Sequence, residues 1–326
     1  MASCWPPTRW LSAMDIHVNA DNFVRAETDR MFGDIQRDAG GVNRLKHNRE
    51  PASIDHQTVI RMNRDTLYSF AIVNLKAGAT LTLPNAAGRY MSAMVVNSDH
   101  LIPAVYHDAG NHALTESIVG SEFAMIGVRT LVDPNNAADI AEVVALQDRI
   151  VVAAGDEEEF ERRDYDAASL DKTRSALLSL GSGLRNFDHM FGTRDQIDPI
   201  RHLIGTAAGW GGLPSTEAAY VGVEPEATGG DYEVTLKDVP AEAFWSISVY
   251  NAQGYFEKNA YGMYTVNSVV ATPNEDGSHT VRFVTGEPTE PNSIPVPPHW
   301  NYLVRLYRPR AEFFDGSWQL PRAVPV

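Results

Sequence analysis

The seven residues Asn63–Ser69 carry an unusually dense set of chemically capable side chains: an amide, a guanidinium, a carboxylate, two hydroxyls and a phenol. The segment stands between two predicted strands, where a turn would usually carry Gly or Pro. Polar groups at this density form either a buried structural network or a binding site, because leaving them unpaired is costly. We expect a site, with Asn63 and Tyr68 contacting a ligand.

Asp65 is the first candidate for a proton-transfer group, and Arg64 beside it could hold an anionic or carbonyl oxygen. A carboxylate next to an arginine has its pKa lowered and acts as a structural acceptor. Burial beneath the strand aromatics would instead raise the pKa of Asp65 toward the range of a general base. The sequence leaves both alternatives open.

Three further polar positions fall at or within predicted strands, where side chains from different strands can meet at one mouth. Asn97 and His100 follow one apolar strand, and Tyr250 ends another. Arg305 lies in the middle of an apolar strand, where a charge requires a partner or solvent. Arg305 is therefore either part of a structural ion pair or a clamp for a ligand carboxylate.

Several common chemistries lack their motifs. No Gly-x-Ser-x-Gly elbow is present, and Gly209–Gly212 has neither the Lys-Ser/Thr of a P-loop nor the order of a dinucleotide fingerprint. That glycine-rich stretch indicates a tight backbone crossing, with Trp210 as a candidate pocket wall. His100, His107 and His112 lack a recognised metal spacing, so we predict no metal and no cofactor. A cupin-like metal enzyme centred on these histidines is kept as an alternative.

Hydrophobic periodicity predicts a helix over residues 15–38, capped by Asp21 and ended by Gly40, and two later helices, 137–155 and from Ser169 to Phe187. The remaining periodic segments predict strands, with 66–75 apolar on both faces and therefore buried on both. The predicted strands are 57–62, 66–75, 80–84, 90–96, 122–131, 232–236, 244–251, 280–284 and 302–307.

This pattern predicts a mainly β chain with helices (α+β): two antiparallel β-sandwich or jelly-roll-like domains joined by a helical section. We place a loose leader at 1–14, an N-terminal helix plus sandwich at 15–134, a helical connector at 135–202 and a C-terminal sandwich at 203–326.

Composition restricts the partners. The 326 residues carry a formal net charge of −15, which disfavours nucleic acid and anionic membranes. The one cysteine, Cys4, rules out an intramolecular disulfide framework, and no stretch has the roughly 20 apolar residues of a membrane span. We therefore expect a cytoplasmic protein with a small-molecule ligand, and exposed sheet faces that allow a homo-oligomer.

Four motifs carry a family resemblance: Asn63–Ser69, Gly209–Pro214, Trp245–Asn251 and Arg305–Pro309. With them the chain resembles the paired domains of unknown function numbered 1254 (N-terminal) and 1214 (C-terminal), over residues 15–325. The resemblance implies two antiparallel β-sandwich or jelly-roll-like domains with a helical section between them. Members are often labelled hydrolases or carboxylesterases, and many relatives are exported, whereas this sequence shows no apolar leader.

The sequence thus predicts an enzyme that acts on a small organic molecule by acid–base chemistry, of hydrolase, lyase or isomerase type. Asp65 or His100 would transfer the proton, and Arg64 or Arg305 would hold an oxygen of the substrate. Tyr68, Trp210 and Tyr250 would line the pocket. The alternative is a non-catalytic binding module for a hydrophobic or carbohydrate ligand.

Overall fold

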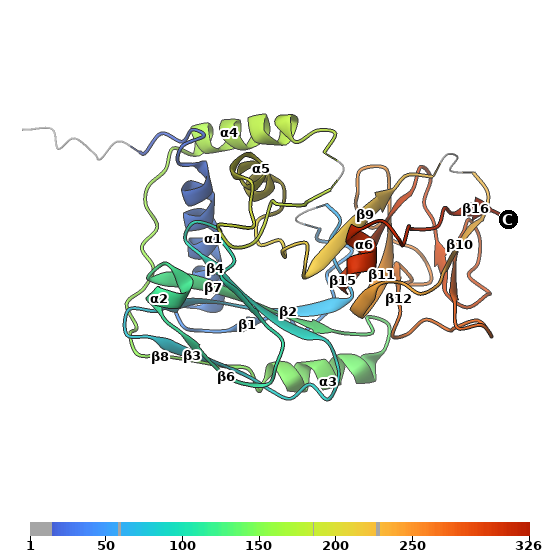
Figure 1. Ribbon diagram of the computed structural model, residues 1–326, viewed down its shortest axis with the longest axis horizontal. Coiled ribbons are helices and arrows are strands. Elements are labelled where there is room, and N and C mark those ends of the chain that lie inside the picture. Colours follow the sequence, from blue (N-terminus) through green and yellow to red (C-terminus); the bar gives the residue numbers. More distant parts are fainter. Residues whose placement is uncertain (1–14, 58–59, 185, 226–228) are drawn as a thin grey trace, which may run out of the picture.

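The chain folds into two β-rich domains that lie side by side (Figure 1). The computed structural model describes residues 15–57, 60–184, 186–225 and 229–326, so the predicted leader lies outside the described residues. The helices are α1 (Phe23–Ala39), α2 (Glu116–Val119), α3 (Ala137–Gln147), α4 (Ala167–Leu180), α5 (Pro199–Gly209) and α6 (Ala311–Phe314). None of these described helices is long and apolar enough to cross a bilayer.

The N-terminal domain is built on an antiparallel five-stranded sheet in the order β1-β2-β7-β4-β5. A three-stranded sheet, β6-β3-β8, covers one of its faces. The strands are β1 (Lys46–His47), β2 (Thr66–Asn74), β3 (Ala79–Leu83), β4 (Met91–Asn97), β5 (Ala104–Tyr106), β6 (Gly110–Leu114), β7 (Phe123–Leu131) and β8 (Val151–Ala154).

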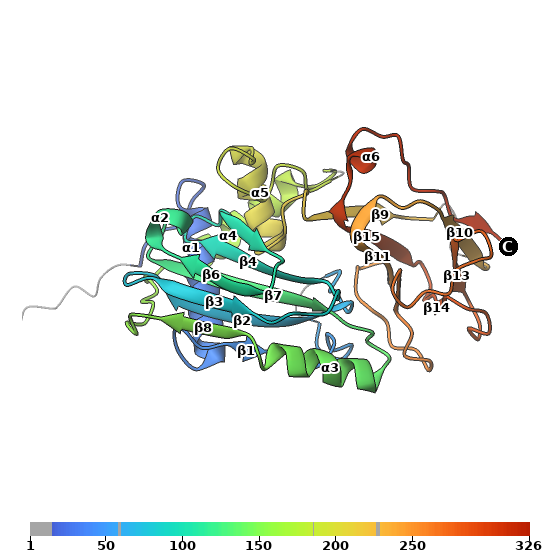
Figure 2. The same cartoon turned by 60° about the horizontal axis from the view of Figure 1, so that its bottom comes forward.

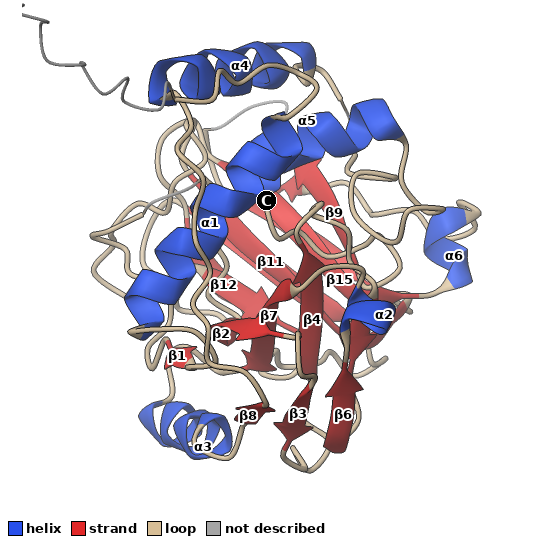
Figure 3. Cartoon of the chain, turned by 90° about the vertical axis from the view of Figure 1, so that its left-hand side faces the viewer, coloured by secondary structure: helices blue, strands red, loops and turns tan. Residues whose placement is uncertain are grey.

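Both faces of the five-stranded sheet are apolar because both are covered. Ala71 and Val73 of β2 pack toward the three-stranded sheet, and Ile72 packs toward the helices α1, α4 and α5 on the other face. Figures 2 and 3 show this arrangement of a small sheet, a large sheet and a helical layer. The expectation that 66–75 is buried on both faces is confirmed.

The C-terminal domain is a sandwich of two four-stranded sheets, in the orders β14-β13-β10-β16 and β12-β11-β15-β9. Between them lies an aromatic-rich core that includes Phe283, Trp300 and Tyr302. Its strands are β9 (Ala218–Val223), β10 (Tyr232–Leu236), β11 (Ala241–Tyr250), β12 (Thr265–Asn267), β13 (His279–Val284), β14 (Ser293–Pro295), β15 (Asn301–Pro309) and β16 (Val324–Pro325).

Strand alternation gives the β12-β11-β15-β9 sheet two different faces. In β11, Trp245, Ile247 and Val249 enter the sandwich core, as their spacing predicted. Ser246, Ser248 and Tyr250 point the other way and are nevertheless fully buried. The N-terminal domain covers this second, polar face, so the polar residues of the sheet meet the other domain instead of solvent.

Several boundaries differ from those predicted. The N-cap of α1 is Asn22 and not Asp21, while Gly40 ends the helix in a left-handed conformation with φ of 78°, as expected. Asp166, whose side chain accepts hydrogen bonds from backbone N–H groups, caps α4 where Ser169 was expected. The helix predicted over 137–155 stops at Gln147, and the apolar residues after it form β8.

The strand predicted over 57–62 is wrong. The described residues of the predicted strand 57–62 form a turn and extended chain, because they lie between the domains without a neighbouring strand; residues 58 and 59 lie outside the described residues. The glycine-rich stretch before Leu213 contains α5, whose small residues let it approach Phe191 and Met190 closely. The segment predicted as a helical connector joins the N-terminal domain, since β8 pairs with β3 and α4 and α5 contact α1.

Candidate functional site

The segment Asn63–Ser69 enters β2 where the polar face of the C-terminal sheet covers the end of the N-terminal sheet. Asn63 organises this junction. Its Nδ2 donates to the phenol oxygen of Tyr307 at 2.9 Å and to Oγ1 of Thr66 at 3.1 Å, with the phenol oxygen of Tyr68 at 3.4 Å. Its Oδ1 accepts from the Asp65 backbone N–H at 2.9 Å, a local turn that fixes the entry to the strand.

Asp65 is fully buried and tied to the other domain. Its Oδ1 accepts hydrogen bonds from Thr265 Oγ1 at 2.9 Å and Asn267 Nδ2 at 3.3 Å, both on β12. Burial raises the pKa of Asp65, against the opposing charge of Arg305. The other carboxyl oxygen, Oδ2, has no hydrogen-bond partner among the described residues. Asp65 therefore fastens the two domains and exposes no surface to a ligand.

Arg64 points away from this junction. It donates to the carbonyl of Ala52 and lies over the ring of Tyr264, with 5.3 Å between the guanidinium carbon and the ring centroid. Burial lowers the pKa of Arg64. The side chain anchors the preceding loop and does not join the groups around Tyr68.

Arg305 lies 2 % exposed at the centre of the polar face. Its Nη1 donates to Ser248 Oγ at 2.8 Å, and its Nη2 donates to the phenol oxygen of Tyr250 at 2.7 Å and to the carbonyl of Arg61 at 2.8 Å. Tyr250 in turn donates to the carbonyl of Met62 at 2.8 Å. These two residues hold the loop before Asn63 against β11 and β15.

Arg129, on β7, is the central charge that the sequence analysis missed. It pairs in register with Tyr68 of β2 on one side and with Ser92 of β4 on the other. Its guanidinium lies 5.4 Å from the centroid of the Tyr68 ring, and Nη2 donates to the Gly211 carbonyl at 2.9 Å. Arg129 is 9 % exposed, and no carboxylate of the described residues forms an ion pair with it.

Five tyrosines surround the two buried arginines, and Tyr68 differs from the others. Burial raises the pKa of four of them: Tyr90, Tyr220, Tyr250 and Tyr307. For Tyr68 burial acts in the same direction, but the Arg129 charge and the hydrogen bond from Asn63 outweigh it and lower the pKa. Like Tyr220, Tyr68 is only half-buried.

His100 and Trp210 form a separate cluster behind Arg129. The Nε2 of His100 accepts the Gly211 N–H at 2.9 Å, and its Nδ1 lies 2.8 Å from Thr206 Oγ1. Because Thr206 donates its hydroxyl proton to the His202 carbonyl, His100 carries its proton on Nδ1. Trp210 stacks on His100 and donates to Thr28 Oγ1 at 3.1 Å.

Asn97 supports the same cluster by holding the turn that follows β4. Its Oδ1 accepts from the backbone N–H groups of Asp99 and Leu101, and its Nδ2 donates to the Val119 carbonyl. His100 accepts from the Gly211 N–H and Arg129 donates to the Gly211 carbonyl, so together they hold the two peptide groups that flank Gly211. The structure brings Asn63, Tyr68, Tyr250 and Arg305 together with Arg129, while His100, Asn97 and Trp210 support the Gly209–Pro214 crossing.

The three histidines considered as metal ligands have unrelated partners. His107 Nε2 lies 2.8 Å from Glu217 Oε2 and its Nδ1 lies 3.1 Å from the Met91 carbonyl, whereas His112 contacts the Asp108 carbonyl. Within the described ranges, no three His, Cys, Asp or Glu side chains gather closely enough to hold a metal ion.

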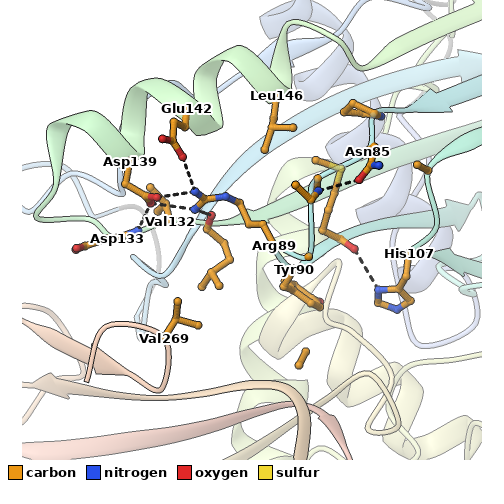
Figure 4. Close-up of a pocket in the computed structure, with 18 of the residues that line it drawn as sticks. Asn85, Arg89, Tyr90, His107, Val132, Asp133, Asp139, Glu142, Leu146 and Val269 are labelled. Carbon is orange, nitrogen blue, oxygen red and sulfur yellow. Dashed lines mark hydrogen bonds and ion pairs between the residues drawn. The ribbon is translucent and has the colours of Figure 1, made fainter. Parts of the chain in front are cut away.

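A cleft of about 910 Å³ opens between the domains beside the junction (Figure 4). Tyr90 and Asn267 lie in its wall. Arg89 and Asp139 also line it and form an ion pair at 2.5 Å. A second cleft, of about 300 Å³, has Tyr220 in its wall. The buried arginines and tyrosines thus adjoin two openings, one at Tyr90 and one at Tyr220.

The residues that sequence analysis overlooked carried one usable signal. Arg129 interrupts an apolar strand in the same way as Arg305, so the criterion that identified Arg305 also applies to it. Tyr307 shares a strand face with Arg305. Thr265 and Asn267 lie on a three-residue strand without a periodic pattern, and only the fold places them beside Asp65.

Solved structures share this fold. The VPA0106 protein from Vibrio parahaemolyticus aligns with a TM-score of 0.73 and 16 % identity over 94 % of this chain and 98 % of its own. An uncharacterized protein from Burkholderia cenocepacia aligns with a TM-score of 0.54 and 13 % identity, over 94 % of this chain and 89 % of its own. At these identities the likeness shows the fold alone. No curated protein is significantly similar to the chain.

Two family matches agree with the motifs. Residues 42–101, which include Asn63–Ser69, match the family described as "Protein of unknown function (DUF1254)". Residues 222–311, which include β11 and β15, match "Protein of unknown function (DUF1214)". The predicted pairing is confirmed: the chain carries a DUF1254 segment in its N-terminal domain and a DUF1214 segment in its C-terminal domain.

Proposed function

We propose that this protein is an enzyme that acts on a small organic molecule by acid–base chemistry, with Tyr68 as the proton-transfer group. The observation that carries the proposal is the position of Tyr68 between Asn63 and Arg129. Among the tyrosines at the junction, its pKa alone is lowered. Perturbed pKa values of this kind concentrate at functional sites, because catalysis needs a group poised to gain and lose a proton.

The surrounding groups suit a proton transfer next to a carbonyl. The phenolate of Tyr68, stabilised by Arg129, would accept a proton from the substrate, and the phenol would return it to another position. Arg129 would stabilise the negative charge that develops on the substrate oxygen. The positive charge of Arg305, buried on β15, would add to this stabilisation. Such a set supplies an acid–base group and an oxyanion partner without a nucleophile, which favours isomerase or lyase chemistry over hydrolysis.

Asp65 has a supporting part in this proposal. Because it is fully buried and bonded to Thr265 and Asn267 of β12, it holds the C-terminal sheet against the start of β2. Tyr68 and Arg129 both belong to the N-terminal sheet, so docking of the C-terminal domain would add Arg305 and Tyr307 to a contact that the N-terminal domain already makes.

The test is a conversion screen with matched variants. A panel of small carbonyl and carboxylic compounds would be incubated with the protein in deuterated water, and proton exchange or product would be followed by NMR. We expect conversion or exchange of at least one compound, with a rate lowered about 100- to 10,000-fold in Tyr68→Phe. Tyr261→Phe, which removes the phenol of an exposed tyrosine, should leave the rate unchanged. Saturable binding without any conversion would favour the non-catalytic binding module instead.

We also propose a cytoplasmic location and no nucleic-acid partner. The single cysteine suits a reducing compartment, and the net charge of −15 opposes phosphate binding. Fractionation of cells that produce the full chain tests the location; recovery outside the cytoplasm would overturn it.

A further inference from the structure

We infer that the substrate of this site carries a carboxylate, which pairs with Arg129, attached to a short apolar body. This inference rests on the proposed function and names the class of its ligand. It follows from three features of the junction: an arginine without an anionic partner, an excess of buried positive charge, and an apolar surface next to both.

The first feature is the state of Arg129. A guanidinium carries several N–H donors, and this one gives one good hydrogen bond, from Nη2 to the Gly211 carbonyl. Its Nη1 reaches the sulfur of Met94 at 4.0 Å, a weak contact. No carboxylate oxygen of the described chain lies within ion-pair distance. Arg89 and Arg174 are instead paired, with Asp139 and Glu27, each at 2.5 Å. Arg305 has no ion pair within the described residues either, but its guanidinium gives hydrogen bonds to Ser248, Tyr250 and the Arg61 carbonyl.

The second feature is the charge balance. Arg129 and Arg305 are both buried, and Asp65 is a buried carboxyl group whose charge acts on Arg305. While the Tyr68 phenol is protonated, these three groups hold one positive charge in excess when Asp65 is ionised and two when it is neutral. A buried charge without a partner is expensive, so a singly charged anion completes the site. A doubly charged phosphate would leave one negative charge uncompensated when Asp65 is ionised.

The unpaired edge of the Arg129 guanidinium also restricts the shape of the anion. One face of the guanidinium lies over the Tyr68 ring, its Nη1 contacts the Met94 sulfur, and its Nε forms no hydrogen bond within the described residues. A planar carboxylate matches that edge with two parallel hydrogen bonds, a geometry that tetrahedral anions fit less well. It would also lie within reach of the Tyr68 phenol.

The third feature is the apolar surface that adjoins the same edge. Phe70 stacks on Tyr68 with ring centroids 5.6 Å apart, and it is only half-buried. The space above Gly127, which lies between Phe70 and Met94 in the register of the sheet, is filled by the Met125 side chain and the edge of the Phe70 ring. A ligand with a flat or short apolar body would lie there by displacing the flexible Met125 side chain. Benzoate is therefore a suitable probe, and benzamide is its neutral counterpart of the same shape.

The experiment measures binding of benzoate, benzamide and inorganic phosphate to the full chain by calorimetry. We expect benzoate to bind and the other two to bind at least about tenfold more weakly. Arg129→Gln should weaken benzoate about ten- to a hundredfold, whereas Arg174→Gln, which alters an arginine of the helical layer, should not. Equal affinity of Arg129→Gln and the unaltered protein, or tighter binding of phosphate or benzamide, would overturn the inference.

A second readout needs no variant of Arg129. A carboxylate on the guanidinium cancels part of the charge that favours the Tyr68 phenolate, so saturating benzoate should move the low-pH tyrosine ionisation upward. Benzoate that binds without moving it would place the ligand elsewhere and refute the inference. If the low ionisation exists but only phosphate binds, the carboxylate fails and the proposed function stands. If benzoate binds through Arg129 and no tyrosine ionises early, the proposed role of Tyr68 fails and the ligand class stands.

Discussion

Arg129 and Tyr68 face each other directly across β7 and β2, with the guanidinium 5.4 Å from the centroid of the phenol ring. A cation over an aromatic face is worth about 0.5–2 kcal/mol, more when solvent is excluded. The contact has two effects: the Tyr68 ring partly compensates the buried charge of Arg129, and that charge favours loss of the phenol proton of Tyr68. The residues Asp65, His100 and Arg305 beside this pair hold the structure together.

Replacing Asp65 should weaken the contact between the two domains. Asp65→Ala removes the acceptor for Thr265 and Asn267, so we expect a loss of about 1–3 kcal/mol in the free energy of unfolding, measured by urea denaturation. Asp65→Asn keeps the acceptor oxygen and puts an amide at the unpaired Oδ2, so stability at neutral pH should be retained. A loss as large as that of the alanine variant would contradict this account. Asp55→Asn, at an exposed ion pair with Lys258, serves as the control.

The pH dependence of Asp65 has a definite sign. Burial raises the pKa of its carboxyl in the folded state above that in the unfolded chain. Its contribution to stability is therefore fully present below the unfolded value of about 3.9 and is lost as pH rises through the folded value. The stability of the unaltered protein relative to Asp65→Asn should fall over that window. An increase with pH would show that the folded pKa is depressed.

His100 predicts the opposite trend. Burial, with the nearby His202, holds the pKa of His100 well below its ordinary value, because the neutral Nε2 accepts the Gly211 N–H. Its contribution is present above the unfolded value of about 6.5 and is lost as pH falls toward the folded value. His100→Asn, which suits the left-handed backbone with φ of 58°, should flatten the acid slope of stability by up to about 1.4 kcal/mol per pH unit.

The control for His100 is an exposed histidine. His56→Gln should leave the slope of the unaltered protein in place. If His100→Asn and the unaltered protein lose stability in parallel on acidification, His100 does not stay neutral in the fold.

Arg305→Lys tests whether geometry or charge matters at that position. Lysine keeps the charge but cannot reach Ser248, Tyr250 and the Arg61 carbonyl together, so we expect a loss of about 2–4 kcal/mol. Arg282→Lys, at a partly exposed arginine, should change stability by no more than about 0.5 kcal/mol. A tolerated Arg305→Lys would show that charge alone holds the loop before Asn63.

The sequence was sufficient to predict several main strands of this protein and which of their faces are buried. Clean alternation in Phe244–Asn251 predicted both the core face and the polar face of β11, and the doubly apolar pattern of 66–75 predicted a strand covered on both sides. It could not show what covers the polar face. Alternation identifies a polar face but carries no information about the domain that docks on it.

The site was only partly predictable for the same reason. Asn63, Tyr68 and Arg305 stand out because costly polar groups fall in or beside apolar strands. The partners of Asp65, by contrast, could not be predicted, because Thr265 and Asn267 lie 200 and 202 residues away from it in the sequence. His100 was a candidate for proton transfer in the sequence, whereas in the fold its Nε2 accepts the Gly211 N–H.

The most direct test of the central claim is a spectrophotometric titration of tyrosine ionisation in the folded protein. The unaltered protein should show one tyrosine that ionises below the ordinary value of about 10 for a phenol, and this transition should be missing in Tyr68→Phe and present in Tyr261→Phe. A titration in which no tyrosine ionises early, or in which Tyr68→Phe keeps the early transition, would contradict the assignment of Tyr68 as the proton-transfer group.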